Sequence, residues 1–298
     1  MRRELTLFTV AIPRAGKPAS GLSNYRKWPS TFYYSGEEWL YGSNADREEF
    51  YSIGALDNGY LFAGNTSEWR ATGDKTMTGG GLWMLQLDAE GDLVGQFLSG
   101  MFNGNGGRFT STQDGGLLFP GDGIAQFAKY DAQGNELWIR SYQAEHPAPA
   151  RAVIETSDGG YAILARTKAG VGGDKTVPRP TTAGRTNDYD VWLLRTDANG
   201  NILWQQSYGG DSADDPHFII ETGSGDLLLL VTTSSAAGTG NNTSGRGVWI
   251  IKVDGDDGGI LWQRSYGVRA DLPHGFVLNP DGGFTFAGST TEPSGGKD

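Results

Sequence analysis

Short apolar runs separated by polar turns recur along most of the chain, and the stretch from Asp188 to Asp226 shows the pattern clearly. It holds the runs VWLLRT and NILWQQSY, joined by the turn DANG, and then a polar elbow followed by the run HFIIET. In such a turn the Asp side chain can cap its own backbone and Gly supplies a positive φ. No window carries apolar residues at helical spacing over the length of a helix. The pattern therefore predicts short antiparallel strands and almost no helix.

Two turn sequences recur and mark internal repeats. The first is an Asp/Ser-Gly turn between two apolar runs, spaced by 44 to 66 residues, with copies that start at Asp57, Asp114, Asp158, Ser224 and Asp281. The second is a hairpin turn of the DANG type, with copies that start at Asp88, Asp131, Asp197 and Asp254. Together they divide each unit into strands A, B, C and D, with a long polar loop between B and C. Four antiparallel strands repeated at such a period predict an all-β fold built of β-propeller blades.

Strand counting predicts five four-stranded blades in a single propeller domain over residues 30–298. The last unit supplies only strands A and B, from Gly275 to Asn279 and from Gly283 to Ser289, whereas Ser30 to Ser43 has the pattern of strands C and D. Joining the N- and C-terminal strands in one blade would close the ring and remove two exposed edges. The alternative is a fragment of a larger ring.

Residues 1–29 are predicted to form an extra strand and arm with no fixed place in this scheme. The run from Leu5 to Ile12 follows Arg2 and Arg3, as in a signal peptide. Polar residues interrupt the run in an alternating pattern, which favours a strand instead.

The charge and composition exclude several classes of partner. The 298 residues carry a formal net charge of -11, which would repel a nucleic-acid backbone or an anionic membrane at long range. With no cysteine, this chain has no disulfide, no thiolate nucleophile and no Cys-ligated zinc. No apolar run approaches the roughly 20 residues of a membrane-spanning helix. We therefore expect no nucleic acid among the partners and no membrane insertion.

One extended pattern resembles a known group of repeats. It reads DGGY, a loop with GDKT, and DxWLL(K/R)xDxxGNxxWxxxYGG, and it is carried by Asp158 to Tyr161, Gly173 to Thr176, Asp190 to Asp197 and Gly200 to Gly210. It resembles the propeller-like repeats of large secreted and surface proteins of Bacteroidetes-type bacteria, over roughly residues 32–298. The resemblance implies export and an extracellular or cell-surface location. It implies no activity, because such repeats are mostly of unassigned function. A weaker resemblance of DANGNILW to quinone-dehydrogenase propellers lacks their size and their vicinal cysteines.

Propeller geometry selects candidate binding residues, because the innermost strands line a central channel. The start of strand A lies seven residues before each A/B turn, and these positions are expected to converge at the channel mouth: Phe50, Gly107, Arg151, His217 and His274. Two of the three histidines are thus equivalent, and Asp214 and Asp271 each lie three residues before one of them. Repeated Pro-His elbows are also compatible with plain packing. Two His and nearby carboxylates suit a divalent metal, but the spacing across blades does not specify one, and we predict no metal and no cofactor.

The B-to-C loops share a face with these positions, and binding residues concentrate in loops on a rigid frame. The first of them carries Trp69 and Arg70; an exposed Trp there would stack on a sugar ring, or else fold back onto the neighbouring blade. Two loops share GDKT, which we interpret as a turn whose Asp accepts backbone hydrogen bonds. Tryptophans at fixed strand positions are predicted to pack between blades, namely Trp83, Trp192, Trp249, Trp138, Trp204 and Trp262.

Motifs for phosphate binding, zinc hydrolysis and a nucleophile elbow do not occur in the sequence. We therefore expect an extracellular or cell-surface binding module that presents its loop-rich face to a glycan or a protein. One alternative is a glycan-active hydrolase or lyase with acid and base drawn from Asp214, Asp271, His217, His274 and Arg151. Another is a structural spacer, which predicts a channel mouth filled by apolar side chains.

Overall fold

The computed structural model describes residues 48–56, 59–66, 76–78, 81–99, 109–132, 134–181, 188–267 and 272–289. All regular secondary structure within these ranges is β, as the sequence predicted, so no helix among them could span a membrane. The chain divides into two compact units, Met1–Phe102 and Asn103–Asp298. Each unit is described by itself.

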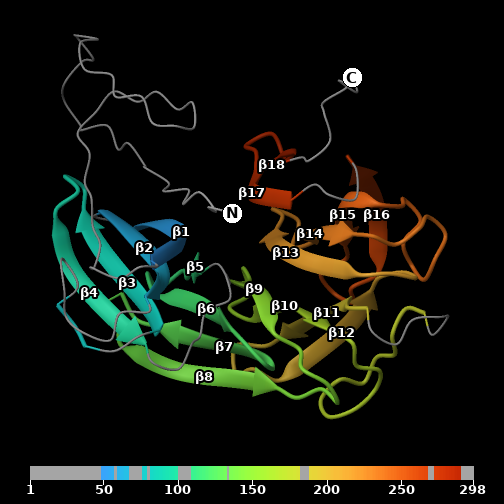
Figure 1. The fold of residues 1–298 in the computed structure, drawn as a ribbon, viewed down its shortest axis with the longest axis horizontal. Coiled ribbons are helices and arrows are strands. Elements are labelled where there is room, and N and C mark those ends of the chain that lie inside the picture. The colour runs from blue at the N-terminus through green and yellow to red at the C-terminus, as the bar shows by residue number, and fades with distance from the viewer. Residues whose placement is uncertain are drawn as a thin grey trace, which may run out of the picture. The chain divides into compact units, whose positions relative to one another are not determined.

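The first unit contains one antiparallel sheet of four strands in sequence order (Figure 1). Its strands are β1 (Glu48–Leu56), β2 (Gly59–Thr66), β3 (Gly81–Asp88) and β4 (Leu93–Ser99). The apolar run of β3 is buried, and Trp83 is fully enclosed. The indole Nε1 of Trp83 donates a hydrogen bond of 3.2 Å to Gln96 Oε1 on β4. The sheet has the strand order predicted for a blade.

The second unit contains three such four-stranded sheets and one two-stranded sheet among its described residues. The first two sheets comprise β5 (Thr110–Ser111), β6 (Leu117–Gly121), β7 (Ala125–Tyr130) and β8 (Glu136–Tyr142), then β9 (Ala150–Glu155), β10 (Tyr161–Thr167), β11 (Asp190–Thr196) and β12 (Ile202–Tyr208). The next two comprise β13 (Asp214–Glu221), β14 (Leu227–Thr233), β15 (Gly247–Val253) and β16 (Ile260–Tyr266), then β17 (Leu272–Leu278) and β18 (Phe284–Ser289).

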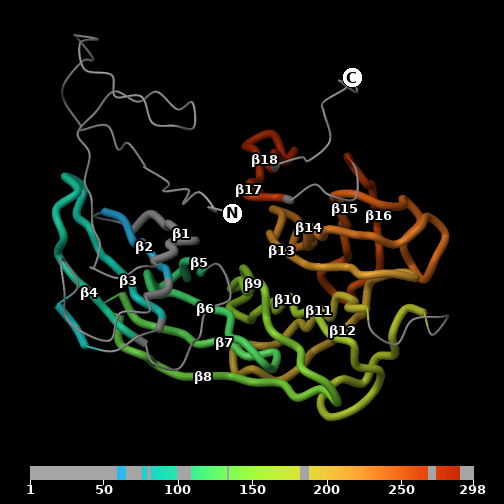
Figure 2. Tube along the Cα trace, in the orientation of Figure 1, coloured from blue at the N-terminus to red at the C-terminus, as the bar shows by residue number. Residues whose placement is uncertain are grey.

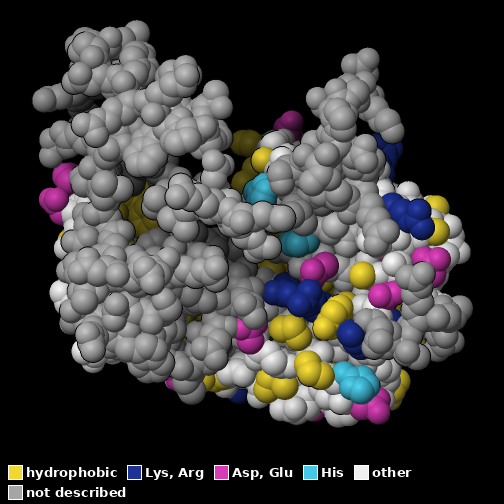
Figure 3. Space-filling view, in the orientation of Figure 1, with side chains coloured by type: hydrophobic (Ala, Val, Ile, Leu, Met, Phe, Trp, Pro, Cys, Tyr) yellow, Lys and Arg dark blue, Asp and Glu magenta, His cyan; other side chains and the backbone are white. Residues whose placement is uncertain are grey.

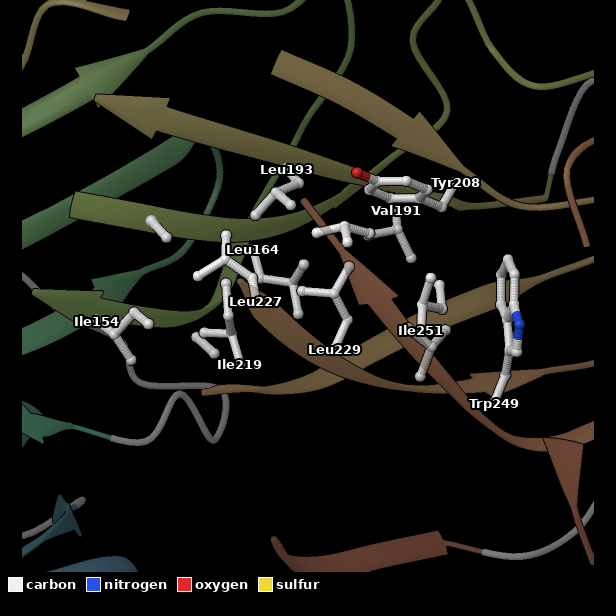
Figure 4. Packing of buried hydrophobic residues seen from close by; sticks show 14 residues of the cluster. Ile154, Leu164, Val191, Leu193, Tyr208, Ile219, Leu227, Leu229, Trp249 and Ile251 are labelled. Carbon is white, nitrogen blue, oxygen red and sulfur yellow. The ribbon is translucent and has the colours of Figure 1, made fainter. Parts of the chain in front are cut away.

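The sheets of the second unit pack face to face with their first strands on the inside. Strand β9 contacts β5 and β13, and β13 contacts β17, whereas β8, β12 and β16 lie on the outside (Figures 1 and 2). Apolar clusters fill the spaces between sheets. In the one drawn in Figure 4, Leu164 and Leu193 meet Leu229 and Ile251 of the following sheet. Successive four-stranded antiparallel sheets that meet along their first strands are β-propeller blades, which confirms the predicted fold class.

The predicted closure involves residues beyond the described ranges. Strand β18 pairs with β17, and the segment predicted to complete this sheet, Ser30 to Ser43, lies outside the described residues, as do residues 1–29. The count of five blades therefore stays a prediction. Strand β17 begins at Leu272, three residues before the predicted start of strand A, because the strand continues through a β-bulge.

Both recurring turns form through local hydrogen bonds. In the A/B turn at Asp158, the carboxylate Oδ1 accepts the N–H of Gly160 at 3.0 Å, and Gly159 has a φ of +83°. In the hairpin at Asp197, the carboxylate Oδ1 accepts the N–H groups of two later turn residues, at 2.9 and 2.8 Å. The Asp caps its own turn in both cases, as predicted.

The recurring tryptophans of the second unit pack between sheets, as predicted. Trp192 and Trp249 belong to buried clusters that include residues of the preceding sheet. On the outer strands, Trp138 contacts the ring of Tyr161 in the next sheet, Trp204 donates a hydrogen bond of 2.9 Å to Gly255 O, and Trp262 stacks on Phe284. The outer and inner tryptophans thus align each sheet on its neighbour.

Candidate ligand-binding site

A β-bulge interrupts the first strand of four sheets near the same register. In β9 the residues that flank Arg151 pair with Leu164 and Ala165, so Arg151 is the extra residue. His217 is the extra residue of β13, and His274 is the extra residue of β17. Bulges bend a strand and redirect a side chain, and they are frequent beside functional sites. Three of the predicted mouth positions are therefore bulge residues.

The remaining mouth positions differ. In β1 the extra residue is Tyr51, one position after Phe50, and Phe50 itself pairs with Gly64 of β2. The offset follows from the shorter connection between β1 and β2, in which Leu56 pairs directly with Gly59. Gly107 lies outside the described residues, and so do Asp271, Trp69 and Arg70.

Arg151 shares a carboxylate with a second arginine. Asp215 of β13 accepts a hydrogen bond of 3.0 Å from Arg166 Nη1 of β10 through Oδ2, and its Oδ1 lies 3.9 Å from Arg151 Nε. The side chains of Arg151, Arg166 and Asp215 are 18%, 26% and 39% exposed, so solvent reaches all three. Burial, and then the charge of Arg166, lower the pKa of Arg151. Cationic and acidic side chains gather in this way on the face seen in Figure 3.

Tyr189 adds an aromatic ring and brings a third cation into the group. The guanidinium carbon of Arg166 and the ammonium of Lys168 each lie 4.6 Å from the centre of the Tyr189 ring, a cation–π arrangement. The backbone oxygen of Tyr189 accepts the N–H of Asp214 at 2.8 Å, which ties the end of the B-to-C loop to β13. We call Arg151, Arg166, Lys168, Tyr189 and Asp215, together with His217 and His274, the bulge site.

Sequence reasoning missed four members of this site, namely Arg166, Lys168, Tyr189 and Asp215. A signal was present, because Arg166 and Lys168 stand two residues apart where strand B passes into its loop, and alternate residues of a strand share a face. Tyr189 closes the same loop, and Asp215 directly follows a residue that was selected. Nothing local in the sequence shows that these segments meet.

The two equivalent histidines differ in their surroundings. His217 is half-buried, and its Nε2 lies 2.8 Å from Thr232 Oγ1 on β14, whereas His274 is exposed. Their strands, β13 and β17, contact each other. Among the described residues there is no group of three or more His, Asp or Glu side chains arranged to hold a metal ion.

Asp214 has a role inside the protein. It is fully buried and accepts hydrogen bonds from Gly210 N at 2.9 Å, from Ser235 Oγ at 3.0 Å and from Thr233 Oγ1. Burial raises the pKa of Asp214 to about 7. The three donors hold the elbow before β13 against the loop after β14. The carboxylate thus fixes the backbone beside the bulge site rather than facing solvent there.

A second buried network of charged side chains includes Asp190, which directly follows Tyr189 of the bulge site in the chain. Asp190 is buried and accepts a hydrogen bond of 2.5 Å from Arg179 Nε, and burial raises the pKa of Asp190 to about 6. Lys175 of the second GDKT turn is also buried; its Nζ donates to Ser207 Oγ at 2.9 Å, and burial lowers its pKa to about 8. In the same turn Asp174 accepts the N–H of Gln143 at 2.7 Å. For this second copy, the interpretation of GDKT as a turn whose Asp accepts a backbone hydrogen bond is confirmed, whereas the Asp of the first copy lies outside the described residues.

Comparison with known proteins supports the fold and leaves the activity open. No family model matches the chain, and no curated protein matches it in sequence. The solved structures similar to it include a protein of unknown function from Dyadobacter fermentans, at 14% identity and a TM-score of 0.51 over 80% of this chain and 75% of that one. At this identity the likeness shows the fold alone.

Two further similar structures have lower TM-scores. A quinohemoprotein alcohol dehydrogenase from Comamonas testosteroni has a TM-score of 0.45 at 11% identity, over 83% of this chain and 39% of that one. A gluconolactonase from Xanthomonas campestris has a TM-score of 0.43 at 15% identity, over 78% of this chain and 74% of that one. Neither similarity carries a functional argument.

Proposed function

We propose that this protein is a non-catalytic binding module of the extracellular space or the cell surface, and that it binds a glycan or a protein at the bulge site. The observation that carries the proposal is that one backbone device, the bulge, presents Arg151, His217 and His274 from three successive sheets. A frame that repeats while its side chains vary is how binding proteins change their ligand.

The chemistry of the site agrees with binding. Two arginines, a lysine and a tyrosine ring provide hydrogen-bond donors and a polar aromatic surface, and all of them come from the inner ends of strands or from an adjoining loop. Asp214, the carboxylate with a pKa near neutrality, is enclosed by three donors and has no exposed surface. The extracellular assignment is supported by the resemblance of the repeats to those of secreted and surface proteins.

The proposal is tested by screening the full chain on a glycan array and by pull-down from an extracellular protein fraction. Any ligand found is then titrated against the variants His217→Ala, His274→Ala and Arg166→Ala. We expect each variant to weaken binding about tenfold, the loss typical of one polar contact to a charged or desolvated group. Arg264→Ala is the matched control, because Arg264 is an exposed arginine on the outer strand β16.

Two outcomes would contradict the proposal. Either no ligand binds, or binding persists unchanged in all three site variants while each retains the wild-type melting temperature. Release of sugar fragments from a bound glycan would show instead that the protein is catalytic.

A further inference from the structure

We infer that the bulge site recognises a single carboxylate on an otherwise uncharged ligand, and that this ligand is a glycan with an acidic sugar residue. The inference rests on the proposed binding function and adds the ligand class. It comes from the charges, the hydrogen-bonding capacity and the geometry of the Arg151, Arg166 and Lys168 group.

The local charge is opposite to that of the whole chain. Arg151, Arg166 and Lys168 bring three positive charges close together, and Asp215 is a carboxylate in contact with the two arginines. This basic group lies within a chain of net charge -11. A single anionic group is attracted to it, whereas a polyanion would be repelled by the rest of the surface.

The geometry suits a carboxylate. Guanidinium groups present parallel N–H donors that match the two oxygens of a carboxylate. Asp215 already holds both arginines in place, with Arg166 Nη1 at 3.0 Å and Arg151 Nε at 3.9 Å from its oxygens. Tyr189 packs against Arg166 on another side. The donors are thus positioned before a ligand arrives, which lowers the entropic cost of binding.

The hydrogen bonds of the group are incomplete. Arg166 has five N–H donors, and among the described residues it makes one hydrogen bond, to Asp215. Its Nε is buried without a hydrogen-bond partner there, whereas the side chain as a whole is 26% exposed. The remaining Nη donors are therefore the ones that a ligand can reach, and a carboxylate oxygen supplies an acceptor for them.

The neighbouring groups favour a sugar as the carrier of the carboxylate. His217 lies two residues from Asp215 on β13 and is paired with Thr232, and His274 is exposed on the adjoining strand. Imidazole and hydroxyl groups donate and accept hydrogen bonds, as sugar hydroxyls require. An acidic peptide would also satisfy the arginines, and the experiment separates the two ligands.

The experiment titrates the full chain by calorimetry with oligosaccharides that carry one uronic-acid residue among neutral sugars, and in parallel with their carboxyl methyl esters and with the corresponding neutral oligosaccharides. We expect the acid to bind at least tenfold more tightly than its ester, since esterification removes the charge and leaves the remaining groups in place. Affinity for the acid should fall as salt rises from about 0.05 to 0.3 M, because ions screen partly exposed charges.

Variants of Arg166 test whether the acidic ligand binds at the arginines. Arg166→Ala should reduce the affinity for the acid at least tenfold, and Arg166→Lys should reduce it several-fold, because lysine keeps the charge but lacks the fork of donors. Both should reduce the difference between acid and ester. The melting temperature of each variant shows whether it is folded, and Arg264→Ala should bind like the wild type.

The possible failures are distinguishable. If neutral glycans bind at the bulge site as tightly as acidic ones, the binding module survives and the carboxylate inference is wrong. A tripeptide with a central Glu that binds more tightly than every uronic acid would overturn the assignment to a sugar. Absence of binding by any glycan, peptide or extracellular protein would remove the proposed function itself.

Discussion

The outer strands of the second unit repeat their side chains from sheet to sheet, whereas the inner strands repeat only their backbone. On the outside, Tyr142 and Tyr208 each donate a hydrogen bond to a glycine carbonyl in the next sheet, Gly200 and Gly258. On the inside, the same bulge carries one arginine and two histidines. A side chain that packs against a neighbour is constrained by that neighbour. A side chain presented by a backbone bulge is free to vary with the ligand.

A recurring hydrogen-bond bridge formed by Trp, Gln and Thr shows that side chains within a sheet are also constrained by their neighbours. Its Gln Oε1 accepts both the indole N–H of a buried Trp and the backbone N–H of a Thr in the B-to-C loop, with members Trp83, Gln96 and Thr76, then Trp192, Gln205 and Thr176, then Trp249, Gln263 and Thr243. The sheet β5–β8 has Gln126 in place of the Trp and Ile139 in place of the Gln. The next residue, Arg140, lies over the ring of Trp138, at 5.2 Å.

The contact between the last two sheets of the unit differs from the earlier contacts between sheets among the described residues. Trp262 and Tyr266 are 38% and 37% exposed, and together with Arg264 and Phe284 they line a pocket of about 320 Å³. Their counterparts Trp204 and Tyr208 are covered by the hairpin between the third and fourth strands of the next sheet. In the last sheet the third and fourth strands were predicted at Ser30 to Ser43, outside the described residues.

The largest effect on the free energy of unfolding is expected from a tryptophan that is buried between the sheets. Trp192→Ala should lower the free energy of unfolding by about 3–5 kcal/mol, because it leaves a cavity and removes the hydrogen bond to Gln205. Chemical denaturation of the full chain measures the loss. Trp262→Ala is the matched control and should cost about 1 kcal/mol or less, since its ring is partly exposed. Equal losses would show that the outer position is as constrained as the buried one.

The next effect concerns two buried carboxylates that accept hydrogen bonds from loop residues, Asp214 and Asp190. The pKa of Asp214 is about 7 and that of Asp190 about 6, both above the ordinary 3.8, so the folded state binds their protons more tightly than the unfolded state. Stability from these groups should therefore fall as the pH rises from about 4 to 7 and level off above that. At about 1.4 kcal/mol per pKa unit, Asp214 contributes a change of the order of 4 kcal/mol.

This prediction is checked with Asp214→Asn, which should remove the slope between pH 6 and 7 and leave the contribution of Asp190 between pH 4 and 6 in urea denaturation. The remaining shifted groups act outside this window. The pKa of Asp158 is about 2, so its contribution is lost below pH 4, and the pKa of Lys175 is about 8. An unchanged slope in the variant would mean that Asp214 is ionised at no cost in the folded protein.

A smaller effect is expected from one tyrosine hydroxyl on the outer strand β12, where this strand contacts the next sheet. Tyr208→Phe removes the donor to Gly258 O, at 2.6 Å in a buried position, and should cost about 1–2 kcal/mol. Tyr266→Phe is the control, because the partly exposed Tyr266 contacts the ring of Phe286 in place of a carbonyl, and it should leave the melting temperature nearly unchanged. A large loss in the control would place a hydrogen-bonding partner on Tyr266.

The smallest effect on stability should come from the inner strand. His274→Ala, at an exposed bulge residue, should change the free energy of unfolding by less than about 0.5 kcal/mol. The same variant should weaken ligand binding, measured by calorimetry with the ligand found by screening. A strong loss of stability with no loss of binding would reverse the roles assigned here to the inner and outer strands.

The sequence by itself determined the strands, the turns and the repeat, because these depend on neighbours within a few residues. The Asp158 turn is closed by Thr156 and Gly160, and the hairpin at Asp197 by residues up to Asn201, so the turn sequence alone indicates the structure. Counting from these turns also located Arg151, His217 and His274, since the same turn and the same pairing of the first two strands put the bulge at an equal distance from the turn. A shorter connection shifted the count by one at Phe50.

Only the tertiary structure decided which of these residues share a site. Arg166 and Asp215 are 49 residues apart and meet because β10 packs against β13 of the next sheet. Asp214, which the sequence marked as a candidate ligand-binding residue, is enclosed by three donors from the elbow before β13 and from the end of β14 and the loop after it. A repeat pattern reports which backbone positions are equivalent. It does not report which side chains the packing of neighbouring sheets buries and which it leaves in contact with solvent.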